Sequence, residues 1–417
     1  MWKLLFSVGL VSVLAPPAAA QSLDEAIADA LARAPQIAQA EAEADAATAR
    51  VQQAVAAKAI TATAQGTMGV GYIDMNGFFS MGASSVVPRA AQVTVEKPLF
   101  TGGRIDQAVA QAQAGAEASA AAKSASTAQL IMDVTQAYTG VQLADKQVAL
   151  LDQSVAQMRA MERDARLMFQ AGAAPKTDLS QAQARRAEAE AGLAQAEGNR
   201  LTARTGYRLL TGKEPGQLSA ASSLRALPAS LAEAVERATS NNPMIRQARA
   251  GVKASEAGTR ASKAETRPTV GAFAEGAMVR DQFFPDYRAD SATVGVRARW
   301  RFYDGGTAKA KIAEASAKER AATAQLRGAE LMVEQQVTAA WHAVKTAEAV
   351  KGATMAQKVA ANDALKNARL EFQIGAKPQL AVLDAQREAT AAGLAEAQAD
   401  AQLLLARTRL RALMGDY

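Results

Sequence analysis

The chain has 417 residues, and its 47 basic against 41 acidic side chains give a formal charge of +6, with 5% aromatic residues, no cysteine and one histidine. The absence of cysteine excludes disulfides, thiolate metal sites and a cysteine nucleophile, and the single His342 excludes multi-histidine metal sites. Because the charges are scattered without dense basic runs, no nucleic-acid partner is predicted.

The first 20 residues have the features of an export signal. Lys3 precedes an apolar run from Leu4 to Leu14, and alanines at 18–20 form a cleavage site of the A-x-A kind. We therefore predict a signal peptide over 1–20 and a mature protein that begins at Gln21. No later run of roughly 18 apolar residues predicts a transmembrane helix.

The remaining sequence consists of two copies of one unit. Ser22-Leu23-x-Glu25-Ala26 recurs as Ser230-Leu231-x-Glu233-Ala234, at an offset of 208. The landmarks that recur at an offset of 203 are Gly102-Gly103 with Gly305-Gly306, Gly172 with Gly375, Pro175 with Pro378, Arg204-Thr205 with Arg407-Thr408, and Gly212 with Gly415. The first copy therefore has five additional residues between Ile37 and Gly102. We predict a first structural repeat over 21–212, an inter-repeat linker over 213–229 and a second repeat over 230–417.

Each repeat begins with a helix, which is followed by segments of alternating polarity. In 292–303 the apolar positions Val294, Val296 and Trp300 alternate with Arg297, Arg299 and Arg301. Residues 91–96 alternate similarly, and the less regular segments near 60–72 and 269–279 are expected to pair with them. The segments 73–89 and 280–290 are predicted to be loops. Each repeat thus supplies one hairpin of strands about ten residues long, which is typical of an outer-membrane barrel.

A long helical hairpin completes each repeat. The segments Gly103–Phe169 and Gly306–Phe372 each contain 67 residues without proline and consist mainly of helix formers. In the first copy, apolar residues recur at alternating spacings of four and three from Leu130 to Met158, as in a coiled-coil seam. A turn follows at 172–175 or 375–378, and a second helix runs back to Gly212 or Gly415, where glycine fits a C-cap.

The predicted strands require more than one chain. A sheet that faces lipid must close, because unpaired backbone groups at an open edge are costly in hydrocarbon. Four strands are fewer than the roughly eight of the smallest membrane barrels. Two, three or four chains would supply eight, twelve or sixteen strands, and this pattern does not choose among them.

The sequence resembles the TolC-type family of outer-membrane efflux proteins, also called outer membrane factors. The resemblance rests on the duplicated units, on the strand-to-helix motifs KPLFTGG at 97–103 and RFYDGG at 301–306, and on the turns at 172–182 and 375–385. It implies a mixed α and β fold: a homotrimer with a 12-strand barrel in the outer membrane and a long α-helical tube in the periplasm. It also implies a passive exit duct in a tripartite efflux or type I secretion system. The implied partners are a periplasmic adaptor, an inner-membrane transporter of the RND, ABC or MFS type, and outer-membrane lipid.

The family also suggests which residues close the periplasmic tip. Its members ring the aperture with aspartates near the turn of the second repeat, and matching turn to turn places Asp384 at one ring position and Ala381 at the other. The polar ties between neighbouring helices would involve Thr177 and Asp178 on one side, and Lys377 and Phe372 on the other. Lysine and phenylalanine replace the family's arginine and tyrosine, which removes a bidentate contact and a hydroxyl.

The turn residues Gly172, Pro175, Gly375 and Pro378 are expected to shape the hairpins and then to contact the adaptor. Gly102, Gly103, Gly305 and Gly306 are expected to form the joints between strand and helix. No catalytic residue, cofactor or metal site is predicted, because the sequence has no credible cluster of catalytic residues for a hydrolytic enzyme. The alternative function is a periplasmic coiled-coil adaptor or scaffold, and the cargo of a duct stays open among drugs, metals and polypeptides.

Overall fold

The computed structural model describes residues 20–75, 82–219 and 226–417, so most of the predicted signal peptide and part of the predicted linker lie outside it. The chain forms two compact units. Unit 1 comprises the described parts of Met1–Gln39, Ser124–Asn242 and Met332–Tyr417, and unit 2 comprises those of Ala40–Lys123 and Pro243–Leu331. Each unit draws on both predicted repeats. The repeat boundaries at 212 and 230 stay a prediction.

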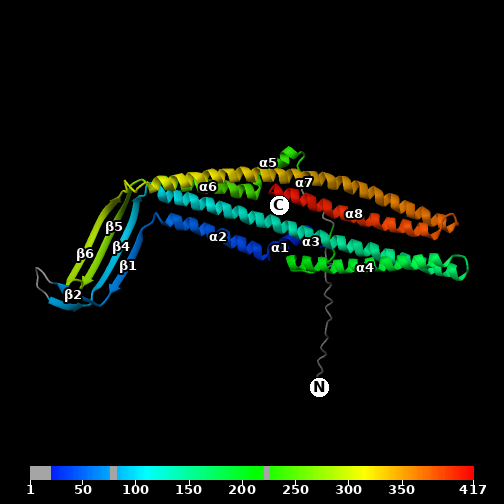
Figure 1. Ribbon diagram of the computed structural model, residues 1–417, viewed down its shortest axis with the longest axis horizontal. Helices are drawn as coiled ribbons and strands as arrows, with labels where there is room; N and C mark the ends of the chain where they lie inside the picture. The colour runs from blue at the N-terminus through cyan, green and yellow to red at the C-terminus, as the bar shows by residue number, and fades with distance from the viewer. Residues whose placement is uncertain (1–19, 76–81, 220–225) are drawn as a thin grey trace, which may run out of the picture. The chain divides into compact units, whose positions relative to one another are not determined.

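The described residues are mostly helical (Figure 1). The helices of the first half are α1 (Leu23–Leu31), α2 (Pro35–Ala56), α3 (Arg104–Gln170) and α4 (Lys176–Thr211). Those of the second half are α5 (Leu231–Asn241), α6 (Pro243–Ala264), α7 (Thr307–Gln373) and α8 (Gln379–Leu413). Among the described residues, none of these helices is both long enough and apolar enough to cross a bilayer.

The repeated Ser-Leu-x-Glu-Ala motif marks the start of a helix. Ser22 accepts a hydrogen bond from the backbone of Glu25, and the Glu25 carboxylate accepts one from the Ser22 backbone, which is a capping box. Ser230 likewise accepts a hydrogen bond from the backbone of Glu233 at the start of α5, but the Glu233 carboxylate accepts one from the backbone N–H of Ala229 instead. The motif recurs because each repeat must satisfy the free N–H groups at the start of its first helix.

The two long helices, α3 and α7, each contain 67 residues, which agrees with the proline-free stretches in the sequence. Much of the predicted seam of α3 is buried, including Val134, Val141 and Val155. One core cluster in unit 1 joins α1, α3 and α4 through Leu23, Val134 and Tyr207. The apolar spacing of four and three therefore describes the packed face of the helix.

The strands β1 (Thr61–Met68), β4 (Arg89–Phe100), β5 (Thr269–Arg280) and β6 (Arg288–Arg299) form an antiparallel sheet in the order β1-β4-β5-β6 (Figure 1). The hairpins of both halves thus join through β4 and β5. Val95, Ala274 and Val294 lie across from one another on β4, β5 and β6 and point to one face of the sheet. Thr94, Glu275 and Thr293 do so on the opposite face. The outer edges of β1 and β6 have no partner strand among the described residues.

The sheet differs from the sequence-based expectation in two places. The segment predicted as a loop at 73–89 contains most of a second hairpin, β2 (Gly71–Met75) paired with β3 (Gly82–Val86). Its glycines and serines lack the apolar alternation that identifies a strand. The last strand ends at Arg299, so Trp300 and Phe302 follow it, with their rings 6.3 Å apart.

Candidate functional site

The two long helical hairpins reverse direction through turns of the same geometry. Gly172 and Gly375 have φ angles of 71° and 75°, a left-handed conformation that glycine adopts without steric cost. Pro175 and Pro378 follow, with φ of −70° and −71°, and cap the next helix. The equivalent turn hydrogen bonds join the backbone N–H of Ala173 to the carbonyl of Met168 and that of Ala376 to Glu371, each at 2.8 Å.

The residues predicted to tie the helices at the tip have separate surroundings within one chain. Lys377 Nζ lies 2.7 Å from a carboxylate oxygen of Glu371, on the helix that precedes its own turn. Thr177 is exposed, and Asp178 is half-buried and forms no ion pair with another described residue. A contact between Lys377 and Asp178 therefore stays a prediction for the assembled protein.

Phe372 occupies the place where the family resemblance expects a tyrosine. Its ring is partly buried against an apolar cluster that includes Leu365 of α7 and Val382 of α8. A side chain packed in this way stabilises the α7–α8 hairpin through apolar contact, which a phenylalanine provides as well as a tyrosine does.

Asp384, the predicted aperture residue, lies exposed on α8 and has a partner that the sequence did not suggest. Arg185 of α4 places a guanidinium nitrogen 3.7 Å from its carboxylate. The same guanidinium lies 2.9 Å from Glu188. Ala381, at the second predicted ring position, is half-buried and carries no charge.

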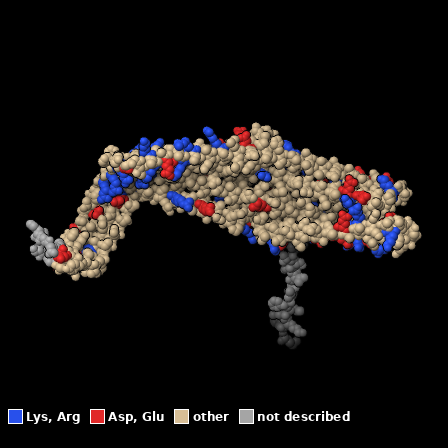
Figure 2. Space-filling view, in the orientation of Figure 1, with Lys and Arg blue, Asp and Glu red and all other residues tan. Residues whose placement is uncertain are grey.

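A buried charge lies next to this pair, between α3 and α4. Glu162 is only 5% exposed and is the single buried charged residue among those described. Arg166 and Arg186 lie 2.6 and 3.1 Å from its carboxylate, and Arg159 lies 2.9 Å from Glu190. Figure 2 shows acidic and basic side chains intermingled on the surface toward the two helical turns.

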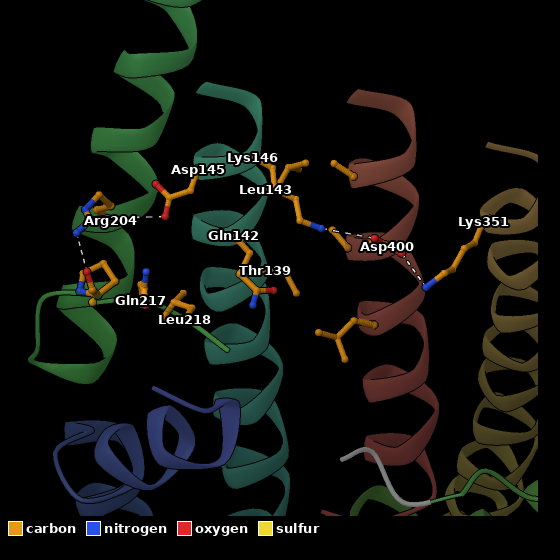
Figure 3. A pocket seen from close by; sticks show the side chains of 15 residues that line it. Thr139, Gln142, Leu143, Asp145, Lys146, Arg204, Gln217, Leu218, Lys351 and Asp400 are labelled. Atoms are coloured by element: carbon orange, nitrogen blue, oxygen red, sulfur yellow. Dashed lines mark hydrogen bonds and ion pairs between the residues drawn. The ribbon is translucent and has the colours of Figure 1, made fainter. Parts of the chain in front are cut away.

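Farther from the turns, a groove of about 680 Å³ opens on the helical layer of unit 1 (Figure 3). In the wall of this groove, the carboxylate of Asp400 on α8 forms two ion pairs. Its oxygens lie 2.8 Å from Nζ of Lys351 on α7 and 3.5 Å from Nζ of Lys146 on α3. Burial alone would raise the pKa of Asp400, but the hydrogen bonds and charges of both lysines outweigh it and hold that pKa below its ordinary value. Asp400 therefore joins three helices through one ionised carboxylate.

The glycines at the joints between strand and helix also adopt left-handed conformations. Gly102 and Gly305 have φ of 64° and 68°, and Gly103 and Gly306 have φ of 91° and 89°. The first joint is closely packed, because Arg267 donates a hydrogen bond to the Gly102 carbonyl at 3.1 Å. These turns come immediately before α3 and α7 and turn the chain into each long helix.

The described residues contain no group of three or more His, Asp or Glu side chains arranged to hold a metal ion. The side chains near the turns can form ion pairs that hold neighbouring helices in register. The exposed ones among them can contact other molecules.

The sequence matches the family model described as outer membrane efflux protein over residues 26–213 and again over 234–416. The chain belongs to the outer membrane efflux protein family. Among curated relatives, the outer membrane efflux protein BepC of Brucella suis biovar 1 (strain 1330) is 28% identical over 271 residues, which cover 65% of this chain. That alignment spans 59% of the length of BepC.

Solved structures share the fold. A membrane protein of Pseudomonas aeruginosa superposes with a TM-score of 0.82 at 21% identity, covering 95% of this chain and 91% of its own. The outer membrane protein VceC of Vibrio cholerae superposes with 0.79 at 17% identity, covering 94% and 96%. The open state of the MtrE outer membrane channel of Neisseria gonorrhoeae superposes with 0.77 at 20% identity, covering 94% and 88%.

Membership in the outer membrane efflux protein family confirms the TolC-type resemblance and the mixed fold of long helices and a membrane sheet. It also confirms the outer membrane as the location, with the helical part in the periplasm. The family consists of channel proteins rather than enzymes, and it decides against the periplasmic adaptor alternative.

Neither Arg185 nor Glu162 was predicted from the sequence. A signal was present, since Arg185 and Arg186 are adjacent and acidic residues follow each at helical spacings of three and four. Charged pairs at such spacings are usual on long, solvated helices. The spacing does not tell which arginine reaches a neighbouring helix.

Proposed function

We propose that this member of the outer membrane efflux protein family is a passive exit duct of a tripartite efflux or type I secretion system. The observation that carries the proposal is the sheet, which has one apolar face, one polar face and two edges that no other described strand pairs with. An apolar face turned toward lipid and a polar face turned toward a watery lumen are the pattern of a membrane barrel.

Closure of that sheet calls for several copies of the chain. Three copies would supply twelve strands, with β1 of one chain pairing with β6 of the next. Their long helices would form the periplasmic tube. A homotrimer of this kind leaves no open strand edge in the hydrocarbon region, which removes the cost of unpaired backbone groups.

At the periplasmic end, the aperture would be formed near the helical turns. Asp384 would line it, and Thr177, Asp178, Lys377 and Phe372 would hold it shut through contacts between helices. Gly172, Pro175, Gly375 and Pro378 would shape the surface that a periplasmic adaptor contacts. The inner-membrane transporter, of the RND, ABC or MFS type, would supply the energy and select the cargo, and the duct itself would perform no catalysis.

The absence of cysteine allows a direct test of barrel closure. Variants would carry A64C on β1 together with one cysteine on the apolar face of β6, at Ala292, Val294, Val296 or Ala298 in turn. After oxidation of intact outer membranes, at least one pair is expected to give covalent dimers and trimers, and no larger species. Denaturing electrophoresis without reductant measures the products.

The matched control pairs residues whose register within one chain is known. Val95 on β4 lies across from Ala274 on β5, so the V95C and A274C pair should oxidise within the chain and leave monomers. If this control oxidises and no β1–β6 pair links separate chains, the shared barrel is wrong. Recovery of the protein in the soluble periplasm, without a heat-sensitive oligomer, would contradict the duct itself.

A further inference from the structure

Arg185 is placed where it acts on the predicted aperture residue. It belongs to α4, which lies against α8. Its guanidinium lies 3.7 Å from the carboxylate of Asp384 and 2.9 Å from that of Glu188. Because a guanidinium stays protonated at all physiological pH values, this positive charge is always present.

Neighbouring contacts hold the backbone of Arg185 in place. The next residue, Arg186, points to α3 and pairs with the buried carboxylate of Glu162, and Glu190 one turn on receives Arg159 of α3. A buried ion pair tolerates little displacement, since separation would leave an uncompensated charge in the interior. The ion pairs between α3 and α4 therefore restrain the backbone position from which the Arg185 side chain extends.

The second repeat lacks this arrangement. At the offset of 203, Glu162 corresponds to Leu365 and Arg186 to Ala389, both in the apolar cluster of the α7–α8 hairpin. Arg185 corresponds to Glu388, so the equivalent position of α8 carries the opposite charge, although α8 has Arg387 next to it. The arginine that pairs with Asp384 belongs to the other hairpin.

We propose that Arg185 neutralises Asp384 while the tip is closed, so that the aperture gains its cation-binding charge only when α8 moves away from α4. This inference rests on the proposed function, because it takes Asp384 to line the aperture. The arginine is 32% exposed and the aspartate 59%, and such solvated pairs are weak. A weak contact can separate during opening without a large barrier. Opening and cation affinity are then coupled through one contact between hairpins.

The test uses the purified full-length protein as an assembled pore in planar bilayers, with Mg²⁺ added on the side of the helical turns. In R185Q the carboxylate of Asp384 loses its fixed partner. Half-block is expected at a Mg²⁺ concentration roughly fivefold lower than for the parent, the effect of one unit charge removed from about 4 Å away in water. R185K keeps the charge and should block near the parent concentration.

Two further variants make the result specific. D384N should lose the high-affinity block, and R200Q removes an arginine elsewhere on α4 and should leave the block unchanged. An R185Q pore that is blocked at the parent concentration would overturn the masking role alone. Unchanged block in D384N would overturn the aperture assignment with it, whereas a parent protein that forms no pore would contradict the proposed function.

Discussion

Two buried tyrosines lie close together between α3 and α4, yet their hydroxyls have different surroundings. The rings of Tyr138 and Tyr207 are 6.4 Å apart. Tyr138 donates to the carbonyl of Ser219 at 2.6 Å and lies 2.9 Å from that of Gln21, so it fastens two strand-like segments to the helical layer. The Tyr207 hydroxyl forms no hydrogen bond of standard geometry with another described residue.

This difference predicts that the change from tyrosine to phenylalanine costs more stability at position 138 than at position 207. Y138F removes one donor from each of two half-buried carbonyls, which keep a second donor, the Gln142 amide for Ser219 and the Ser219 N–H for Gln21. It should lower the free energy of unfolding by about 0.5–1.5 kcal/mol, the net contribution of a hydrogen bond. Y207F removes a hydroxyl that makes no hydrogen bond of standard geometry with another described residue, and it should change the free energy of unfolding by less than about 0.5 kcal/mol. Thermal unfolding of the purified protein, followed by circular dichroism of the helices, measures both. Equal losses in the two variants would contradict the hydrogen-bond assignment.

Tyr207 also makes the stability of the folded protein depend on pH in the alkaline range. Burial, with smaller effects from neighbouring Tyr138 and Asp29, raises the pKa of Tyr207 from 10.0 to about 12. Between these values the unfolded chain has released the phenolic proton and the folded chain still holds it, so stability falls as pH rises. Y207F should lose stability less steeply than the parent across this interval.

At the level of single residues, the sequence could identify positions defined by backbone geometry but not those defined by partners. Gly172 and Gly375 were found because a left-handed turn between helices selects glycine. The partner of Lys377 was not predicted, because Glu371 lies on the other side of the turn and charge alone does not specify which acid a flexible lysine reaches. Arg185 and Asp384 are 199 positions apart and meet only in the folded unit.

At the level of elements, the two joints between strand and helix share a conformation but differ in packing. A Cβ atom on Gly102 would lie 2.7 Å from the Cβ of Arg267 and 3.0 Å from the carbonyl oxygen of Ala264. A Cβ atom on Gly305 would have no neighbour within 4 Å. The duplication thus supplies two glycines with φ of 64° and 68°, one confined by α6 and one open.

We expect G102A to be more harmful than G305A. Both substitutions place alanine in a left-handed conformation, which costs roughly 1–2 kcal/mol. G102A adds a clash with backbone that cannot move away freely, so it should also reduce the yield of heat-sensitive oligomer on gels. G305A should keep most of that yield. A pair of variants with the same yield would show that conformation alone determines the requirement for glycine at this joint.

The long elements were predictable for a physical reason that the short ones lack. A stretch of 67 residues without proline, most of them helix formers, leaves few alternatives to α3 and α7, and the apolar seam fixes the face that packs. β2 and β3 are five residues each, and small or polar residues such as Gly71, Ser84 and Ser85 give them no amphipathic pattern. Their pairing depends on contact between the two segments, which composition does not reveal.

At the level of the whole molecule, the duplication gives each helical hairpin an ion pair between its two helices at the same position. Asp145 and Arg204 lie 3.8 Å apart in the first hairpin, and Glu348 and Arg407, at the same positions of the second repeat, lie 3.0 Å apart. In unit 1 the helices follow one another as α4, α3, α8 and α7 (Figure 3). At the level of the groove in unit 1, α3 and α8 therefore join the two hairpins, whereas nearer the turns Arg185 of α4 reaches Asp384 of α8.

Glycines let α3 pack closely against two neighbours, α8 in the other hairpin and α4 in its own hairpin. A Cβ atom on Gly393 of α8 would lie 3.4 Å from the side chain of Leu150 on α3. A Cβ atom on Gly192 of α4 would lie 4.0 Å from the side chain of Leu151, the next residue on α3. Adjacent residues of one helix thus face different neighbours, one in the same hairpin and one in the other.

If opening moves the α7–α8 hairpin away from the α3–α4 hairpin, a link between hairpins should prevent it. We expect L150C with G393C, joined by a cleavable bis-maleimide, to abolish the rare high-conductance events of single pores in planar bilayers. Such events would report an open state populated at about 0.1–10%. Cleaving the linker with reductant should restore them.

The matched pair L151C with G192C carries the same linker within one hairpin, which moves as a unit in this mechanism, and should leave the events unchanged. Loss of the events in both linked variants would indicate that opening requires separation within the first hairpin as well. Events at the parent frequency in the linked L150C and G393C pore would contradict movement between hairpins, because α3 and α8 could not then have separated.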